Sequence, residues 1–234
     1  MTVTADGLTQ PAPARSLPDI GSDVYQPQHD SYLLIEAMMS IAPPEGVSVA
    51  DLCTGSGVVA LAAAAAGAYS VSAFDRSPAA VECARTQALA AGADIEVFEG
   101  AWTRAVATGP YDLVLCNPPY VPAPPDLASS EVPGPALAVN AGRDGRQVLD
   151  PLCAAAPALL RRHGTLLIVQ SELADIPRTV NTLTANGLRS SVLAQKRIPF
   201  GPVLHSRARW LEETGLLPVG KRIETLAVIA AVKP

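Results

Sequence analysis

The feature that most constrains the fold is a regular alternation of short apolar runs with longer alanine-rich segments, which begins near residue 47. The apolar runs are typical of buried strands, and the alanine-rich segments are typical of helices. Strands are predicted at residues 47–52, 70–75, 95–100, 111–116, 165–170, 190–198 and 225–232. Strands that alternate with helices favour an α/β fold with a doubly wound, mostly parallel sheet.

Local signals indicate where several helices begin and end. Ser77 is a predicted N-cap, Pro78 fits a first helical turn, and Gly92 suits the residue that ends a helix. Helices are predicted over residues 31–39, 57–67, 77–92, 145–161 and 173–185, and a long loop over 117–143. Residues 1–22 lack apolar periodicity, so we predict a flexible N-terminal arm followed by a single domain over 23–234.

Charge and cysteine content argue against several classes of protein. The chain has 17 Lys and Arg against 22 Asp and Glu, which is unlike proteins held to nucleic acid through phosphate contacts. The four cysteines are scattered without a C-x-x-C pair, so we interpret them as reduced thiols in a cytoplasmic protein without a metal. The N-terminal sequence and the short apolar runs predict neither secretion nor a membrane partner.

The segment DLCTGSG, residues 51–57, joins the first predicted strand to the next helix. In a doubly wound sheet, ligands bind outside the carboxyl ends of the strands. Gly55 and Gly57 allow a tight turn and a close approach of a ligand to the backbone. Asp75 ends the second predicted strand, where a carboxylate can accept both hydroxyls of a ribose. These features favour a nucleoside ligand, and an ordinary βα turn is the structural alternative.

A second motif, Asn117-Pro118-Pro119-Tyr120, follows the strand predicted over 111–116. The two prolines stiffen the turn and remove two backbone donors. The side-chain oxygen of Asn117 and the backbone oxygen of Pro118 can accept both hydrogens of a planar NH₂ group. Tyr120 offers an aromatic face to a flat substrate. We therefore predict that these four residues are catalytic, and a proline-rich turn capped by the asparagine is the structural alternative.

These motifs, in this order, resemble the class I S-adenosylmethionine-dependent methyltransferases, and among them the HemK-type protein glutamine N5-methyltransferases. DLCTGSGVVAL resembles the first motif of that family, FDRSPAAVECA its ribose-binding segment, and NPPY its clamp for the substrate amide. Residues 131–145 resemble the loop after the clamp, and residues 24–37 resemble the start of the short form without a helical N-terminal domain. The resemblance implies a Rossmann-like, seven-stranded sheet with an antiparallel C-terminal strand.

The resemblance also implies an activity, partners and a set of binding residues. The activity is methyl transfer from S-adenosylmethionine to the side-chain amide of a glutamine in a protein such as a translation release factor, and a small activator subunit is an open question. Cys53, Ala101 and His29 depart from the family pattern. Tyr25, Pro27 and Asp30 could instead only fix the start of a helix, and this alternative is weighed equally with cofactor binding. The cofactor-binding residues that the resemblance implies are Tyr25, Pro27, Asp30, Asp51, Thr54, Gly55, Gly57, Asp75, Arg76, Ala101, Trp102 and Asn117.

Two other functions are kept as hypotheses. A flipped adenine or guanine presents the same planar amine, and residues 196–222 contain six basic side chains, which fits a nucleic-acid methyltransferase. Glu212 and Glu213 interrupt this segment and aromatic residues are scarce, so nucleic acid is the less favoured substrate. The third hypothesis is a noncatalytic, methyltransferase-like scaffold. His163, expected at a helix end, and His205, expected in a basic loop, receive no role.

Overall fold

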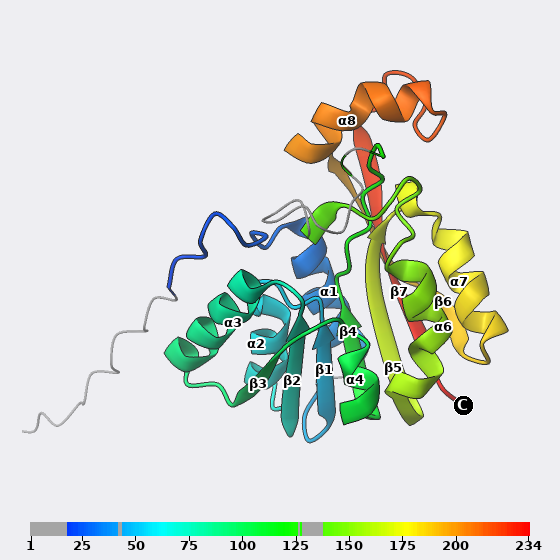
Figure 1. Cartoon of the computed structure of the whole chain (residues 1–234). Helices are drawn as coiled ribbons and strands as arrows, with labels where there is room; N and C mark the ends of the chain where they lie inside the picture. The colour runs from blue at the N-terminus through cyan, green and yellow to red at the C-terminus, as the bar shows by residue number, and fades with distance from the viewer. Residues whose placement is uncertain (1–17, 42–43, 126, 128–137) are drawn as a thin grey trace, which may run out of the picture.

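A computed structural model describes residues 18–41, 44–125, 127 and 138–234 of the protein (Figure 1). Residues 1–17 of the predicted arm and residues 131–137 of the segment after NPPY lie outside the described residues. The strands are β1 (Ser48–Leu52), β2 (Ser70–Asp75), β3 (Ile95–Glu99), β4 (Tyr111–Cys116), β5 (Leu160–Ser171), β6 (Arg189–Pro199) and β7 (Ile223–Val232). The described helices are α1 (His29–Ile41), α2 (Val58–Ala65), α3 (Pro78–Ala91), α4 (Arg104–Thr108), α6 (Leu149–Leu159), η1 (Glu172–Ala174), α7 (Ile176–Ala185) and α8 (Pro202–Glu213).

The strands form one seven-stranded sheet in the order β3-β2-β1-β4-β5-β7-β6. The pairs from β3 to β5 are parallel, and β7 runs antiparallel to both of its neighbours. All five residues of β1 are buried, as expected for a strand that is covered on both faces. The predicted α/β fold with a mostly parallel sheet and an antiparallel C-terminal strand is therefore confirmed.

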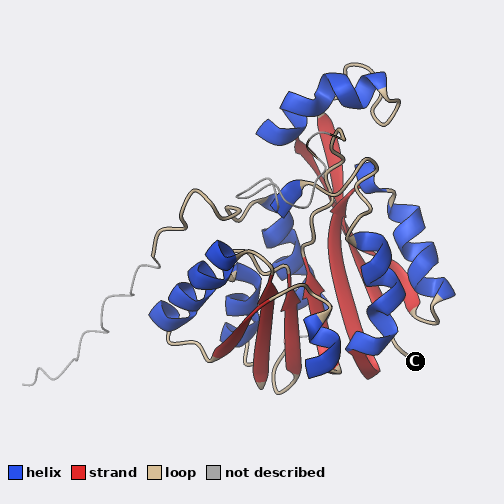
Figure 2. Cartoon of the chain, in the orientation of Figure 1, coloured by secondary structure: helices blue, strands red, loops and turns tan. Residues whose placement is uncertain are grey.

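Helices cover both faces of this sheet (Figure 2). Helix α2 contacts α1 and α3, whereas α6 contacts α4 and α7, so the helices form two separate groups. The predicted ends of α3 are confirmed, because the Ser77 hydroxyl accepts from the Ala80 N–H and Gly92 adopts a left-handed conformation. Among the described residues, no helix is both long and apolar enough to cross a membrane.

Several predicted boundaries are wrong. His205 lies in α8 and not in a loop, because Leu204, Ala208 and Leu211 form an apolar stripe that packs against the core. His163 lies within β5 and not at a helix end, since β5 begins as early as Leu160. The predicted helix 145–161 is shorter and starts at Leu149, and the short helix α4 was not predicted.

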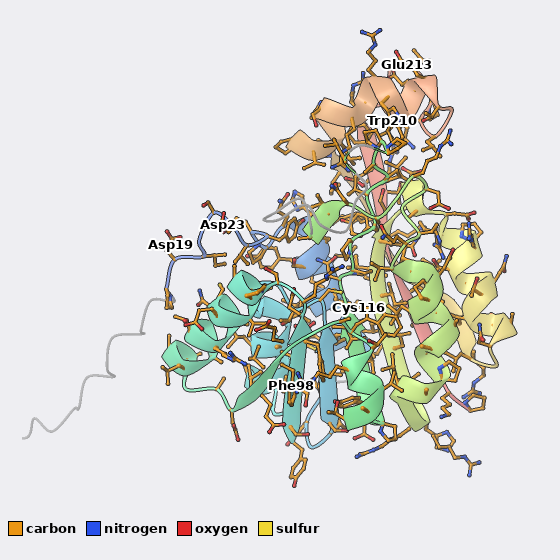
Figure 3. All side chains as sticks on the ribbon, viewed as in Figure 1. Asp19, Asp23, Phe98, Cys116, Trp210 and Glu213 are labelled. Atoms are coloured by element: carbon orange, nitrogen blue, oxygen red, sulfur yellow. The ribbon has the colours of Figure 1, made fainter. Side chains whose placement is uncertain are left out.

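Helix α8 stands beyond the edge of the sheet at which the parallel strands end (Figure 1). It follows β6 directly, and Arg207 ties it to the segment after β4 by donating to the backbone oxygen of Pro122 at 3.0 Å. Figure 3 places Trp210 and Glu213 on α8, whereas Cys116, the last residue of β4, lies in the body of the molecule. Helix α8 and the turn before it therefore lie above the carboxyl ends of the parallel strands.

Candidate active site

A cavity of about 580 Å³ lies at the carboxyl ends of β1, β2 and β4. Its wall combines the start of α1, the turns after β1 and β2, the segment after β4, and the segment between β6 and α8. Every predicted site residue except Gly57 contributes to this wall: Tyr25, Pro27, Asp30, Asp51, Thr54, Gly55, Asp75, Arg76, Ala101, Trp102, Asn117, Pro118, Pro119 and Tyr120. Motifs that are far apart in the sequence thus surround one space.

Asp51, the fourth residue of β1, stabilises the glycine turn through two hydrogen bonds. Its Oδ2 accepts from the Thr54 hydroxyl at 2.5 Å and from the backbone N–H of Ala60 at 3.1 Å. Burial raises the pKa of this carboxyl to about 7, although both hydrogen bonds act in the opposite direction. Asp51 and Thr54 line the cavity, but their hydrogen bonds are used to fix the backbone of the turn.

The glycine turn requires left-handed backbone at three positions. Gly55 has φ +56° and faces open space, so a ligand can approach its backbone. Gly57 has φ +83°, and a Cβ at this position would lie 3.1 Å from the Cβ of Ala84 on α3. Gly57 therefore allows close packing of two helices and does not contribute to the cavity wall. Cys53 has φ 58°, an uncommon conformation for a residue with a side chain.

Asp75, at the end of β2, accepts a hydrogen bond from the glycine turn and lines the cavity. One carboxylate oxygen accepts from the Gly55 N–H and the other from the Ser77 N–H, both at 2.9 Å. Burial is the main influence on the Asp75 carboxyl and raises its pKa, against the effect of these backbone donors. The Arg76 N–H is a third backbone donor to this carboxylate, which keeps acceptor capacity for a ribose hydroxyl.

Asp30, in the first turn of α1, joins the N-terminal segment to the NPPY motif. Its Oδ2 accepts from the Tyr25 hydroxyl at 2.9 Å and the Tyr120 hydroxyl at 3.0 Å, and its Oδ1 accepts from the Ser31 N–H at 2.7 Å. Burial, together with the nearby Asp30, raises the pKa of both tyrosines above the ordinary value. Both hydroxyls therefore stay protonated and act as donors. We call Tyr25, Asp30, Ser31 and Tyr120 the Asp30 cluster.

The NPPY motif presents two acceptors at the end of β4 that have no partner in the described part of the chain. Asn117 donates from Nδ2 to the Ser31 hydroxyl at 3.3 Å, and within the described residues its Oδ1 accepts no hydrogen bond. The backbone oxygen of Pro118 also accepts no hydrogen bond from the described residues. Because β4 pairs with β1, these two oxygens lie beside the glycine turn, as predicted. Tyr120 is buried and lines the same cavity.

Some residues of the wall were not predicted as site residues. Ser31 was predicted only at the start of a helix and Ser77 only as an N-cap, yet both hydrogen-bond to site residues. Glu224, at the start of β7, is buried in the wall, and no hydrogen bond to its Oε2 is present in the described ranges. Burial raises the pKa of Glu224 to about 7. An acidic residue at the start of an otherwise apolar strand was the sequence signal for it.

The cavity is chemically divided along the edge of the sheet. The ends of β1 and β2 offer the open side of Gly55 and the Asp75 carboxylate, which suit a nucleoside. The end of β4 offers two acceptors with a fixed backbone, which suit the hydrogens of a planar amine. A group bound at one part would therefore lie next to a group bound at the other.

Comparisons with known proteins agree with this arrangement. Residues 26–125 match the family model described as the methyltransferase small domain. A protein of Methanocaldococcus jannaschii named as a protein N5-glutamine methyltransferase is 31% identical over 178 residues, which cover 76% of this chain and 87% of that protein. The release factor glutamine methyltransferase of Mycolicibacterium smegmatis is 33% identical over 193 residues, and the match covers 79% of this chain but only 66% of the relative.

A solved structure supports the fold over almost the whole chain. The E. cuniculi Mtq2–Trm112 complex, described as responsible for the methylation of the eRF1 translation termination factor, has a chain that superposes with a TM-score of 0.63 at 21% identity. The superposition covers 91% of this chain and 99% of that chain. On the strength of the sequence match that covers 87% of the M. jannaschii relative, the chain belongs to the protein N5-glutamine methyltransferases, a family of class I S-adenosylmethionine-dependent enzymes.

Proposed function

We propose that this protein transfers a methyl group from S-adenosylmethionine to the side-chain nitrogen of a glutamine in a protein substrate. The observation that carries the proposal is a pair of acceptors, Asn117 Oδ1 and Pro118 O, which have no donor among the described residues and lie next to a turn suited to a nucleoside. A glutamine side chain ends in a planar NH₂ group whose two hydrogens match two acceptors.

The residues of the cavity fit the methyl donor. The Asp75 carboxylate has acceptor capacity for a ribose hydroxyl, and Gly55 leaves space for a ligand against its backbone. Trp102 and Ala101 line the wall beyond β3, which suits contact with the flat base. When bound, S-adenosylmethionine supplies a methyl group that its sulfonium makes electrophilic.

The chain's own contribution to the reaction is orientation and electrostatics. An amide nitrogen is a poor nucleophile because its lone pair is delocalised into the carbonyl group. Acceptors on both N–H groups hold the nitrogen in place and stabilise the positive charge that develops on it. Holding reactants in a near-attack geometry is worth about 7–11 kcal/mol, so a strong base is not required.

A translation release factor is the substrate we propose. The Mycolicibacterium smegmatis relative is named for release factor methylation, and the E. cuniculi complex for methylation of a termination factor. The second of these is a complex with Trm112, so a small partner subunit is the additional component to supply if the purified chain alone is inactive.

A base-methylating enzyme is the competing proposal, because a flipped base also presents a planar amine. Its support was the six basic residues between positions 196 and 222. Four of these bond within the protein: Arg209 with Glu213, Arg222 with Glu212, Lys221 with Glu172, and Arg207 with the backbone of Pro122. This surface is therefore less suited to phosphates than the sequence indicates.

Labelled S-adenosylmethionine and a cell lysate test the proposal. The purified protein should transfer label to material that protease destroys and nuclease leaves intact. The matched control is Asn117→Ala, which removes the side-chain acceptor and leaves the glycine turn and Asp75 in place. Label that nuclease removes would overturn the proposal in favour of base methylation.

A further inference from the structure

The Asn117 amide is held from one side by Ser31, a residue with no role in the function proposed above. Ser31 lies in the first turn of α1, 86 positions before Asn117 in the sequence, and is 3% exposed. Its Oγ lies 3.3 Å from Nδ2 of Asn117 and 3.2 Å from Oδ1 of Asp30. A buried hydroxyl thus connects the Asp30 cluster to the amide of the NPPY motif.

The direction of these hydrogen bonds follows from Asp30. Its carboxylate already accepts from Tyr25, Tyr120 and the Ser31 backbone, so the Ser31 hydroxyl donates its single hydrogen to Asp30 as well. Ser31 Oγ is then left with lone pairs alone, and only the NH₂ end of the Asn117 amide can complement it. The oxygen end of that amide must turn away from Ser31.

We propose that Ser31 is a positioning residue that keeps the acceptor oxygen of Asn117 turned toward the substrate amine. The two ends of an asparagine amide are nearly equal in size, so a half-turn of the terminal torsion costs little unless a neighbour distinguishes them. After such a turn, a donor would face the substrate NH₂ group. The inference rests on the proposed role of Asn117 as the amide acceptor.

Kinetics of Ser31 variants provide the first test, with a peptide that carries the acceptor glutamine. Ser31→Ala should lower kcat about tenfold, because the acceptor is no longer held in one orientation, while the affinity for S-adenosylmethionine stays within about twofold. Ser31→Thr retains the hydroxyl and should restore most of kcat. In an Asn117→Ala background, Ser31→Ala should cause no further loss, since the amide through which it acts is gone.

The side-chain amide signals of Asn117 in nitrogen-15 NMR spectra provide a second test that needs no activity. They are identified by their absence in Asn117→Ala, and Ser31→Ala should shift them whereas Ser31→Thr should leave them near the wild-type position. Unchanged signals in Ser31→Ala, or an equal loss of kcat with and without Asn117, would overturn the inference. If the wild-type protein methylates no glutamine peptide, the proposed function fails, and the NMR comparison still decides the role of Ser31.

Discussion

Replacing Asp30 with alanine should destabilise the protein by an amount that its hydrogen bonds allow us to predict. Tyr120 is 9% exposed, so its hydroxyl cannot reach water once its acceptor is gone, which costs about 1–3 kcal/mol. The Tyr25 hydroxyl loses its acceptor at a partly exposed position, at about 1 kcal/mol, and the buried Ser31 N–H loses its acceptor at about 1–3 kcal/mol. We expect a total of about 3–7 kcal/mol, a large part of the 5–15 kcal/mol typical of domains.

Urea unfolding measures this loss, and the slope of the free energy against urea concentration should stay constant. Tyr120→Phe is the matched control. It should cost about 1–2 kcal/mol in the wild-type protein but should cause no loss and recover some stability in Asp30→Ala, where the buried hydroxyl has already lost its acceptor. Equal costs in both backgrounds, or an Asp30→Ala protein within about 0.5 kcal/mol of wild type, would refute the Asp30 cluster as a stabilising unit.

Three further predictions concern the site. Asp75→Ala should weaken S-adenosylmethionine binding by about 1.5–3 kcal/mol in calorimetric titrations, and unchanged affinity would exclude Asp75 as a ribose acceptor. Asn117→Ala should lower kcat by roughly 10²–10³ with cofactor affinity near wild type, and full activity would reduce the motif to a structural turn. Between about pH 5 and pH 8 the unfolding free energy should fall, because the raised pKa of Asp51 and of Glu224, each about 7, makes the folded protein retain protons that the unfolded chain releases. Asp51→Asn should make the unfolding free energy, measured by urea titration at each pH, depend less on pH. An unchanged pH dependence would contradict the raised pKa of Asp51.

The elements of the fold that the sequence predicts well are those in which a local pattern and burial agree. The bounds 70–75 and 111–116 are confirmed as β2 and β4, because both segments are short apolar runs between clear turn residues. Helix α8 was missed because its interspersed charged residues, including the buried Arg207, concealed the spacing of Leu204, Ala208 and Leu211. Its apolar stripe is evident only when the helical period is applied.

The residues that line the cavity could be predicted from the sequence better than the hydrogen bonds between them. Fourteen of the fifteen predicted site residues line the cavity, since the ends of parallel strands meet at one edge of the sheet. Gly57 differs because the residue it must accommodate, Ala84, comes from another helix. The bond between Tyr120 and Asp30 joins residues 90 positions apart, and no local pattern indicates such a contact.

The measurement that tests the central claim most directly is the position of the transferred methyl group. Protein substrate labelled by the wild-type enzyme would be digested and sequenced by tandem mass spectrometry, with Asn117→Ala as the enzyme control. We predict that the methyl group lies on the side-chain nitrogen of a single glutamine and is absent when the variant is used at the same concentration. A methyl group on another kind of side chain, or on a nucleic-acid base, would contradict the proposal that the acceptors at the end of β4 select a glutamine amide.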